Sequence, residues 1–184
     1  MGENGRWVYP DAGEGTGVSM SGYDFESMKV LVADDSRPMR SLINSFLYGF
    51  GVREMDEAGD ANEAFDVVVS FDPDIVITDW RMPPTDGLDL VRKIRMDTKS
   101  PNPYLPIIML TGFTELHRVK QARDAGVTAF LAKPISAAAL YRRLCTVIDD
   151  QRPFVRVGEF FGPDRRSRRR AEPYMGVERR RDAQ

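Results

Sequence analysis

Between residues 28 and 150 the sequence alternates five short apolar runs with segments whose apolar residues recur at helical spacing. Short continuous apolar runs are typical of strands buried on both faces, and strands that alternate with helices form a parallel sheet covered on both sides. We therefore expect an α/β protein with a doubly wound, five-stranded parallel sheet and five helices. The expected strands are Lys29–Ala33, Val52–Ala58, Asp74–Asp79, Leu105–Leu110 and Val127–Ala132, of which the second is the most polar and so an edge strand.

The expected helices are bounded by residues that start or stop helices. Ser36 and Ser136 are suitable N-caps, and Pro73 and Gly126 prevent continuation of the helices that precede them. The expected helices run from Ser36 to about Tyr48, from Asp60 or Ala61 to Phe71, from Leu88 to Met96, from Thr114 to Ala125 and from Ser136 to Asp149.

Polar residues stand at the carboxyl ends of four of these strands. Asp34-Asp35, Asp79 and Thr111 each follow an apolar run directly, and Lys133 follows Ala132. Ligands bind at the carboxyl edge of an open parallel sheet, so these side chains are expected to share one crevice. Three carboxylates, a hydroxyl and an ammonium are suited to a divalent cation and a phosphoryl group.

The chemistry of that set can be worked out from the residue types. A carboxylate can act as a nucleophile and form an acyl phosphate. Three acids about 4 Å apart would repel by roughly 4 kcal/mol per pair at an effective dielectric of 20, and Mg²⁺ removes that repulsion. Lys133 supplies a positive charge for phosphoryl oxygens, and Thr111 supplies a short hydroxyl donor.

Composition excludes several other classes of protein. No apolar run approaches the roughly 18–20 residues that span a membrane, and no secretory signal is recognisable at the start. A single cysteine, Cys145, permits no internal disulfide, which favours a cytoplasmic protein. The chain has neither a dinucleotide fingerprint nor a P-loop, and its one histidine, His117, makes it an implausible histidine phospho-donor.

In its ordered set of motifs, the chain resembles the receiver domain of two-component response regulators, of the chemotaxis-regulator type. The resemblance covers roughly residues 28–150. It rests on Asp34-Asp35, on Asp79 44 residues after Asp35, on Thr111, and on Lys133-Pro134 22 residues after Thr111. Met82-Pro83 and Asp86-Gly87 match the loop that follows the acceptor, although Asp86 can equally be a simple helix start.

The resemblance implies a flavodoxin-like sheet of order 2-1-3-4-5 and a role for each site residue. Asp79 would be the phospho-acceptor, with Lys133 and Thr111 at the phosphoryl group. Asp35 and Asp79 would bind Mg²⁺ directly, Asp34 would act at longer range or through water, and the backbone carbonyl of Arg81 would add a ligand. Thr111 and Phe130 would act as switch residues, although Phe130 can also be plain core.

Two segments lie outside this resemblance. Residues 1–27 are Gly-rich and aperiodic and are expected to form a flexible leader. Residues 151–184 carry 10 Arg against 5 acids, a charge of +5, whereas residues 1–150 carry 16 Lys and Arg against 23 acids, a charge of −7. Three interpretations of this Arg-rich tail remain open: a solvated segment with its aromatic residues packed on the receiver, a docking peptide for an acidic partner, or a nucleic-acid contact.

The sequence thus predicts a stand-alone response regulator in a two-component phosphorelay. Its expected partners are a histidine kinase or histidine phosphotransfer protein and an unidentified downstream protein, whereas neither membrane nor nucleic acid is the expected partner. No separate substrate turnover is expected beyond its own phosphorylation and dephosphorylation. The alternatives are a haloacid-dehalogenase-type phosphatase, which would want an acid where Arg81 stands, and a nucleic-acid-binding regulator acting through the basic tail.

Overall fold

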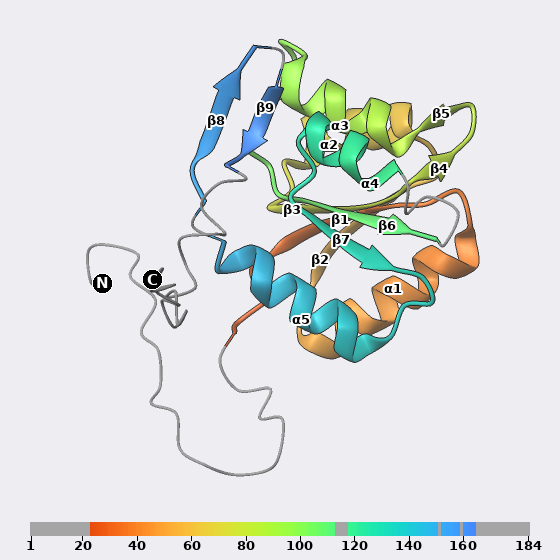
Figure 1. Cartoon of the computed structure of the whole chain (residues 1–184). Coiled ribbons are helices and arrows are strands. Elements are labelled where there is room, and N and C mark those ends of the chain that lie inside the picture. Colours follow the sequence, from red (N-terminus) through yellow and green to blue (C-terminus); the bar gives the residue numbers. More distant parts are fainter. Residues whose placement is uncertain (1–22, 113–117, 151, 159, 165–184) are drawn as a thin grey trace, which may run out of the picture.

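The computed structural model describes residues 23–112, 118–150, 152–158 and 160–164 (Figure 1). Most of the expected leader, the first turns of the helix expected from Thr114, His117 and the two arginine runs lie outside these residues. Phe25 falls within the expected leader, but it is 2% exposed and packs in the core, so the chain joins the folded domain ahead of its first strand.

Five parallel strands form the central sheet, in the order β2-β1-β3-β6-β7. This confirms the expected topology, because β6 and β7 are the fourth and fifth strands of this sheet, and the polar second strand lies at an edge as predicted. Their bounds are Lys29–Ala33 (β1), Glu54–Ala58 (β2), Ile75–Asp79 (β3), Ile107–Thr111 (β6) and Ala129–Ala132 (β7).

Helices cover both faces of the sheet, as Figure 1 shows. One core cluster joins Leu31 and Val76 to α2, α3 and α4, and the other joins Val30 and Ile77 to α1 and α5. Alternate strand residues therefore face opposite layers, which is why the strands are apolar throughout. The helices are Arg37–Phe50 (α1), Ala61–Phe71 (α2), Gly87–Met96 (α3), Val119–Ala125 (α4) and Ala137–Ile148 (α5).

Helix ends follow the expected signals with one difference. Asp60 and Ser136 accept backbone N–H groups as N-caps of α2 and α5, and Gly51 and Gly126 end α1 and α4 in the left-handed conformation. Ser36 occupies the N-cap position of α1, but its side chain makes no capping hydrogen bond. No helix among the described residues is long and apolar enough to cross a bilayer.

Two short antiparallel pairs were not expected from the sequence. β4 (Arg81–Met82) and β5 (Thr85–Asp86) form a small hairpin between β3 and α3. β8 (Phe154–Val157) and β9 (Phe160–Pro163) form a second hairpin. It lies at the opposite end of the molecule from β4 and β5 (Figure 1). We call residues 152–164 the C-terminal extension.

Aromatic rings attach this extension to the domain. Phe154 and Phe161 lie 5.3 Å and 5.2 Å from Tyr104 between ring centroids, and Phe161 is 8% exposed. The Arg95 guanidinium lies 5.2 Å from the Phe154 ring and donates to the carbonyls of Gly126 and Pro103. Burial lowers the pKa of Arg95 to about 9, so it remains a cation at neutral pH, held by carbonyl dipoles and a ring face.

Candidate metal and phosphoryl site

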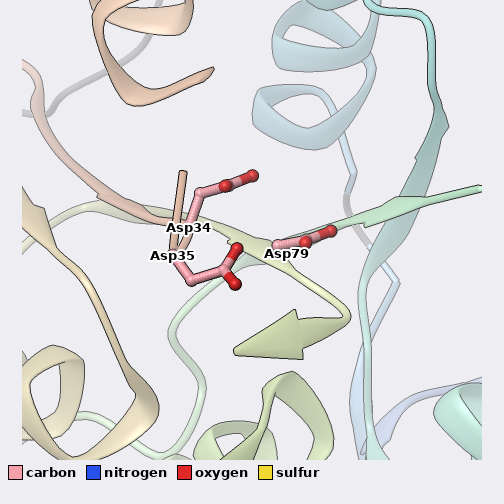
Figure 2. Close-up of side chains that lie close together, drawn as sticks. All are labelled: Asp34, Asp35 and Asp79. Atoms are coloured by element: carbon pink, nitrogen blue, oxygen red, sulfur yellow. The ribbon is translucent and has the colours of Figure 1, made fainter. Parts of the chain in front are cut away.

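Three carboxylates meet at the carboxyl edge of the sheet. Asp34 and Asp35 follow β1, and Asp79 ends the neighbouring strand β3 (Figure 2). One oxygen from each lies within 4.8 Å of the other two. The structure therefore brings together the three acids that the sequence placed in one crevice.

Lys133 joins two of these acids from the loop after β7. Its Nζ atom lies 2.9 Å from Asp79 Oδ1 and 3.1 Å from Asp34 Oδ2. The backbone N–H of Lys133 donates to the carbonyl of Thr111 at 2.8 Å, which ties this loop to the end of β6. The cluster thus holds three carboxylates against one ammonium, and this excess of negative charge suits a divalent cation.

The three acids differ in their surroundings. Asp34 is fully buried, and its Oδ1 accepts the N–H of Ser36 at 2.8 Å while Oδ2 faces Lys133. Asp35 is exposed, and no hydrogen bond engages its carboxylate among the residues that the structure describes. The Asp79 side chain keeps 12% of its surface exposed, enough for an incoming group to reach it.

Burial sets the titration of the central pair. Burial raises the pKa of Asp79, and its neighbour Asp34 adds to the rise, while the hydrogen bond and charge of Lys133 oppose it. Burial by itself would lower the pKa of Lys133, but the hydrogen bonds and charges of Asp79 and Asp34 outweigh it and raise that pKa. The lysine stays charged, and Asp79 carries negative charge that the protein alone compensates incompletely.

Thr111 and Phe130 lie on the two strands nearest Lys133. Thr111 ends β6 and is 2% exposed. Phe130 is a half-buried residue of β7 that packs against the core layer of α2, α3 and α4. Thr111 thus stands at the edge that carries the acids, and Phe130 lies three residues before Lys133 on the same strand and loop.

The loop after Asp79 is shaped by a backbone contact. A Cβ atom at Gly87 would lie 2.1 Å from the carbonyl oxygen of Asp79, so only glycine fits there, and Gly87 N donates to Trp80 O at 2.8 Å. Arg81 is an exposed residue of β4. Asp86 caps α3 in a capping box with Asp89, which agrees with its interpretation as a helix start.

Sequence reasoning missed Arg40 and Arg118. Arg40 donates to the backbone carbonyl of Asp34 at 2.6 Å and to Glu57 at 2.7 Å, which anchors the turn that carries Asp34 and Asp35. Arg118 lies 3.9 Å from Asp86 and over the Trp80 ring at 5.4 Å. Each arginine stands on or just before a helix with nothing in the local pattern to distinguish it, so only the three-dimensional structure reveals these contacts.

A doubly wound parallel sheet of this strand order, with an acid cluster and a lysine at its carboxyl edge, defines a flavodoxin-like protein. Residues 30–145 match the family model of the response regulator receiver domain, and the chain belongs to that family. The receiver resemblance seen in the sequence is thereby confirmed.

The chain is similar to chemotaxis proteins and to the receiver domain of a sensor histidine kinase. The chain is 33% identical over 124 residues to chemotaxis protein CheY-3 of Vibrio cholerae, covering 67% of this chain and 94% of that protein. The crystal structure of Vibrio cholerae CheY4 matches with a TM-score of 0.60 and 31% identity, over 65% of this chain and 98% of that one. A third match is the receiver domain of the Pseudomonas aeruginosa sensor histidine kinase PA1611, whose structure has a magnesium ion coordinated in the active-site cleft. It matches with a TM-score of 0.59 and 27% identity, over 66% of this chain and 97% of that one.

Proposed function

We propose that this chain is a phospho-accepting response regulator whose acceptor is Asp79. The observation that carries the proposal is the position of its carboxylate, 2.9 Å from Lys133 Nζ and within 4.8 Å of oxygens of Asp34 and Asp35. A nucleophilic carboxylate needs a cation to receive the charge of the incoming phosphoryl group, and Lys133 is that cation.

The donor of the phosphoryl group would be a phosphohistidine on a histidine kinase or phosphotransfer protein. An Asp79 oxygen attacks the phosphorus atom, the P–N bond breaks, and its electron pair returns to the imidazole nitrogen. Lys133 holds the phosphoryl oxygens, and Thr111 supplies a hydroxyl beside them. Water later attacks the phosphorus atom of the acyl phosphate and releases inorganic phosphate, so the chain turns over no separate substrate.

Mg²⁺ suits the donors of this site. Asp35, Asp79 and the Arg81 carbonyl would hold it directly, and Asp34, whose oxygens already have partners, would act from further away. When bound, the ion supplies positive charge that offsets the carboxylates and the phosphoryl oxygens. The magnesium site of the PA1611 receiver supports this proposal by analogy.

Output would pass through protein contact rather than catalysis. The added phosphoryl group brings about −1.5 to −2 charges, and Thr111 and Phe130 would carry the change toward the surface of α4, β7 and α5. A kinase partner and a downstream protein partner in the cytoplasm fit a signalling protein of the receiver family.

Replacing the acceptor tests the proposal. Wild-type protein incubated with acetyl phosphate and Mg²⁺ should gain one phosphoryl group by intact-mass spectrometry, and Asp79→Asn should gain none. The matched control is Asp66→Asn, because Asp66 is an exposed acid on α2 away from the cluster, and this variant should label like wild type. Unchanged labelling of Asp79→Asn would assign the acceptor elsewhere.

A further inference from the structure

The exposed acid of the cluster depends on the backbone that carries it. Asp35 contributes an oxygen to the three-acid cluster (Figure 2), yet its carboxylate accepts no hydrogen bond among the residues that the structure describes. The direction in which this side chain leaves the turn between β1 and α1 is therefore set by the backbone. A group that fixes the peptide unit between Asp34 and Asp35 also fixes that direction.

Strand β2 holds both backbone groups of Asp34. The N–H of Asp34 donates to the carbonyl of Ala58, the last residue of β2, at 3.1 Å. The carbonyl of Asp34 accepts from Arg40 Nη1 at 2.6 Å, and Arg40 Nε donates to Glu57 Oε2 on β2 at 2.7 Å. The carbonyl of Asp34 and the N–H of Asp35 belong to one planar peptide unit, so Arg40 holds the plane that leads into Asp35.

The guanidinium of Arg40 is itself held in one orientation. Its side chain is 11% exposed, so little water competes for its hydrogen bonds. Glu57 is engaged from a second side, because Asn44 Nδ2, one helical turn after Arg40 on α1, donates to Glu57 Oε1 at 2.6 Å. A planar guanidinium that donates to a carboxylate through Nε and to a carbonyl through Nη1 is fixed by both contacts. Helix α1 and strand β2 thus form a preorganised support for the turn.

Charge and position predict opposite effects of this arginine on a bound cation. A guanidinium close to the acids repels Mg²⁺, so its charge alone would weaken binding of the ion. The Glu57 carboxylate, 2.7 Å from Arg40 Nε, offsets that charge within the pair. The orientation of the peptide unit before Asp35 is therefore the larger effect of Arg40 on the site.

We propose that Arg40 is a positioning residue for the Mg²⁺ site: it holds the peptide unit before Asp35, and Glu57 is its support. This inference rests on the proposed function, in which Asp35 is a direct ligand of the ion. It gives the edge strand β2 a role, because β2 supplies no acid to the cluster but orients it through one side chain of α1. Removing a group that orients a metal ligand typically costs about 10- to 100-fold in metal affinity.

Mg²⁺ titration followed by the fluorescence of Trp80 tests the role. Arg40→Gln should weaken Mg²⁺ binding about tenfold, at the lower end of that range, because Arg40 contacts the backbone and not the ligand oxygen. Arg40→Lys keeps the charge but lacks the planar fork that joins Glu57 to the Asp34 carbonyl, so it should also weaken binding. Arg37→Gln is the charge control: it removes an exposed arginine from the same helix and should bind Mg²⁺ at least as tightly as wild type.

A double-mutant cycle shows whether Glu57 acts through Arg40. Glu57→Gln should weaken Mg²⁺ binding about threefold in the wild-type background, because a neutral acceptor holds the guanidinium less firmly than a carboxylate does. The same change should have no effect in Arg40→Gln. Equal weakening in both backgrounds would show that Glu57 acts only as a nearby negative charge, and it would overturn the proposal.

Phosphorylation kinetics separate positioning of the ion from a general loss of structure. With acetyl phosphate as donor, Arg40→Gln should need about tenfold more Mg²⁺ for half-maximal labelling of Asp79. Its rate at saturating Mg²⁺ should return to that of wild type, because excess ion compensates for weaker binding. A reduced rate at saturating Mg²⁺ with an unchanged midpoint would overturn the positioning role.

The spectrum of the Mg²⁺-free protein gives a further readout, which needs neither ion nor donor. Replacing Arg40 by Lys, the milder change, should shift the amide signals of Asp35 and Ser36 and leave those of β6 in place. Unmoved signals of Asp35 and Ser36 would overturn the proposal.

The outcomes distinguish this inference from the proposed function. Equal Mg²⁺ affinity of wild type and Arg40→Gln would overturn the inference and leave Asp79 as the proposed acceptor. Tighter binding by Arg40→Gln would show that charge outweighs position, which also overturns the inference alone. Wild-type protein that binds no Mg²⁺ would refute the proposed magnesium site and, with it, any positioning role for Arg40.

Discussion

Neighbouring acids in this site have opposite surroundings. Asp34 is buried with both oxygens engaged, whereas Asp35 is exposed at the mouth of the cluster. A metal ion needs oxygens that are free to turn toward it, and a buried carboxylate that already holds a lysine and a backbone N–H is less able to do so. In the proposed magnesium site, Asp34 would therefore have the structural role and Asp35 the binding role.

Mg²⁺ affinity should follow that difference. Asp35→Ala should weaken Mg²⁺ binding at least about tenfold and leave the unfolding temperature close to that of wild type. Asp34→Ala should weaken binding less but lower the unfolding temperature more, because Lys133 and Ser36 N lose a buried partner. The fluorescence of Trp80, which directly follows Asp79, can report the titration. The reverse order of affinities would mean that the two roles are exchanged.

The raised pKa of Asp79 should appear in its own titration. Carbon-13 NMR of the Asp79 carboxyl group in Mg²⁺-free buffer should give a midpoint above the ordinary 3.8, because burial disfavours the charged form. A carboxyl with a raised pKa favours folding while protonated, and that contribution is lost as pH rises through its folded-state pKa. Asp79→Asn should therefore gain in stability relative to wild type as pH rises through this range, and Mg²⁺ should move the wild-type midpoint down. A midpoint at or below 3.8 without Mg²⁺ would contradict the prediction.

Among the elements, those with a strong local pattern could be predicted from the sequence and those made by distant contacts could not. The five sheet strands and the capped helices α2 and α5 stand close to their expected bounds. Asp34, Asp35, Asp79 and Lys133 could be placed in one crevice because parallel strands end at a common edge. The contacts of Arg40 and Arg118 could not be predicted, because their partners lie on other elements.

The C-terminal hairpin shows the same limit. Its strands are only Phe154–Val157 and Phe160–Pro163, and their pairing carries little signal without the surface beneath. The aromatic residues of this segment suggested that it packs on the receiver. The position of the hairpin, however, depends on its contacts with Tyr104, Arg95 and Gly126, and no local sequence pattern links these residues to the hairpin.

Substitutions at two glycines can measure how much the contact between the C-terminal hairpin and the domain contributes to the unfolding free energy. Gly126 and Gly51 have similar left-handed backbones, φ 99° and 107°, but a Cβ atom meets Phe161 at Gly126 and nothing within 4 Å at Gly51. Each change to Ala should cost about 1–2 kcal/mol of backbone strain. Gly126→Ala should cost at least about 1 kcal/mol more, because it also displaces the hairpin.

Urea unfolding of both variants provides the measurement, and Gly51→Ala is the control for strain alone. Equal losses of unfolding free energy in the two variants would show that displacing the hairpin costs no stability and that its contact with Gly126 is weak.

At the scale of the whole molecule, we expect the C-terminal extension to add stability to a domain that folds without it. A chain ending at Asp150 should still unfold cooperatively and accept phosphate at Asp79. Its unfolding free energy should fall by roughly 1.5–3 kcal/mol, the contribution expected from burying the Phe161 side chain.

A chain ending at Asp164 is the matched control, since it keeps every described element, and it should unfold like the full chain. Failure of the shorter chain to fold would make residues 152–164 part of the indispensable core.

The order of the sheet also bears on how copies of this chain meet in a crowded solution. An open sheet has two outer strands whose backbone groups can pair with a second molecule, the usual first step of aggregation. One outer strand, β2, carries Glu54, Asp56 and Glu57, so two copies approaching by this edge repel each other. The other, β7, spans only Ala129–Ala132, so it offers few backbone groups for a second molecule to pair with. Like charge protects one margin of the sheet, and the shortness of the strand protects the other.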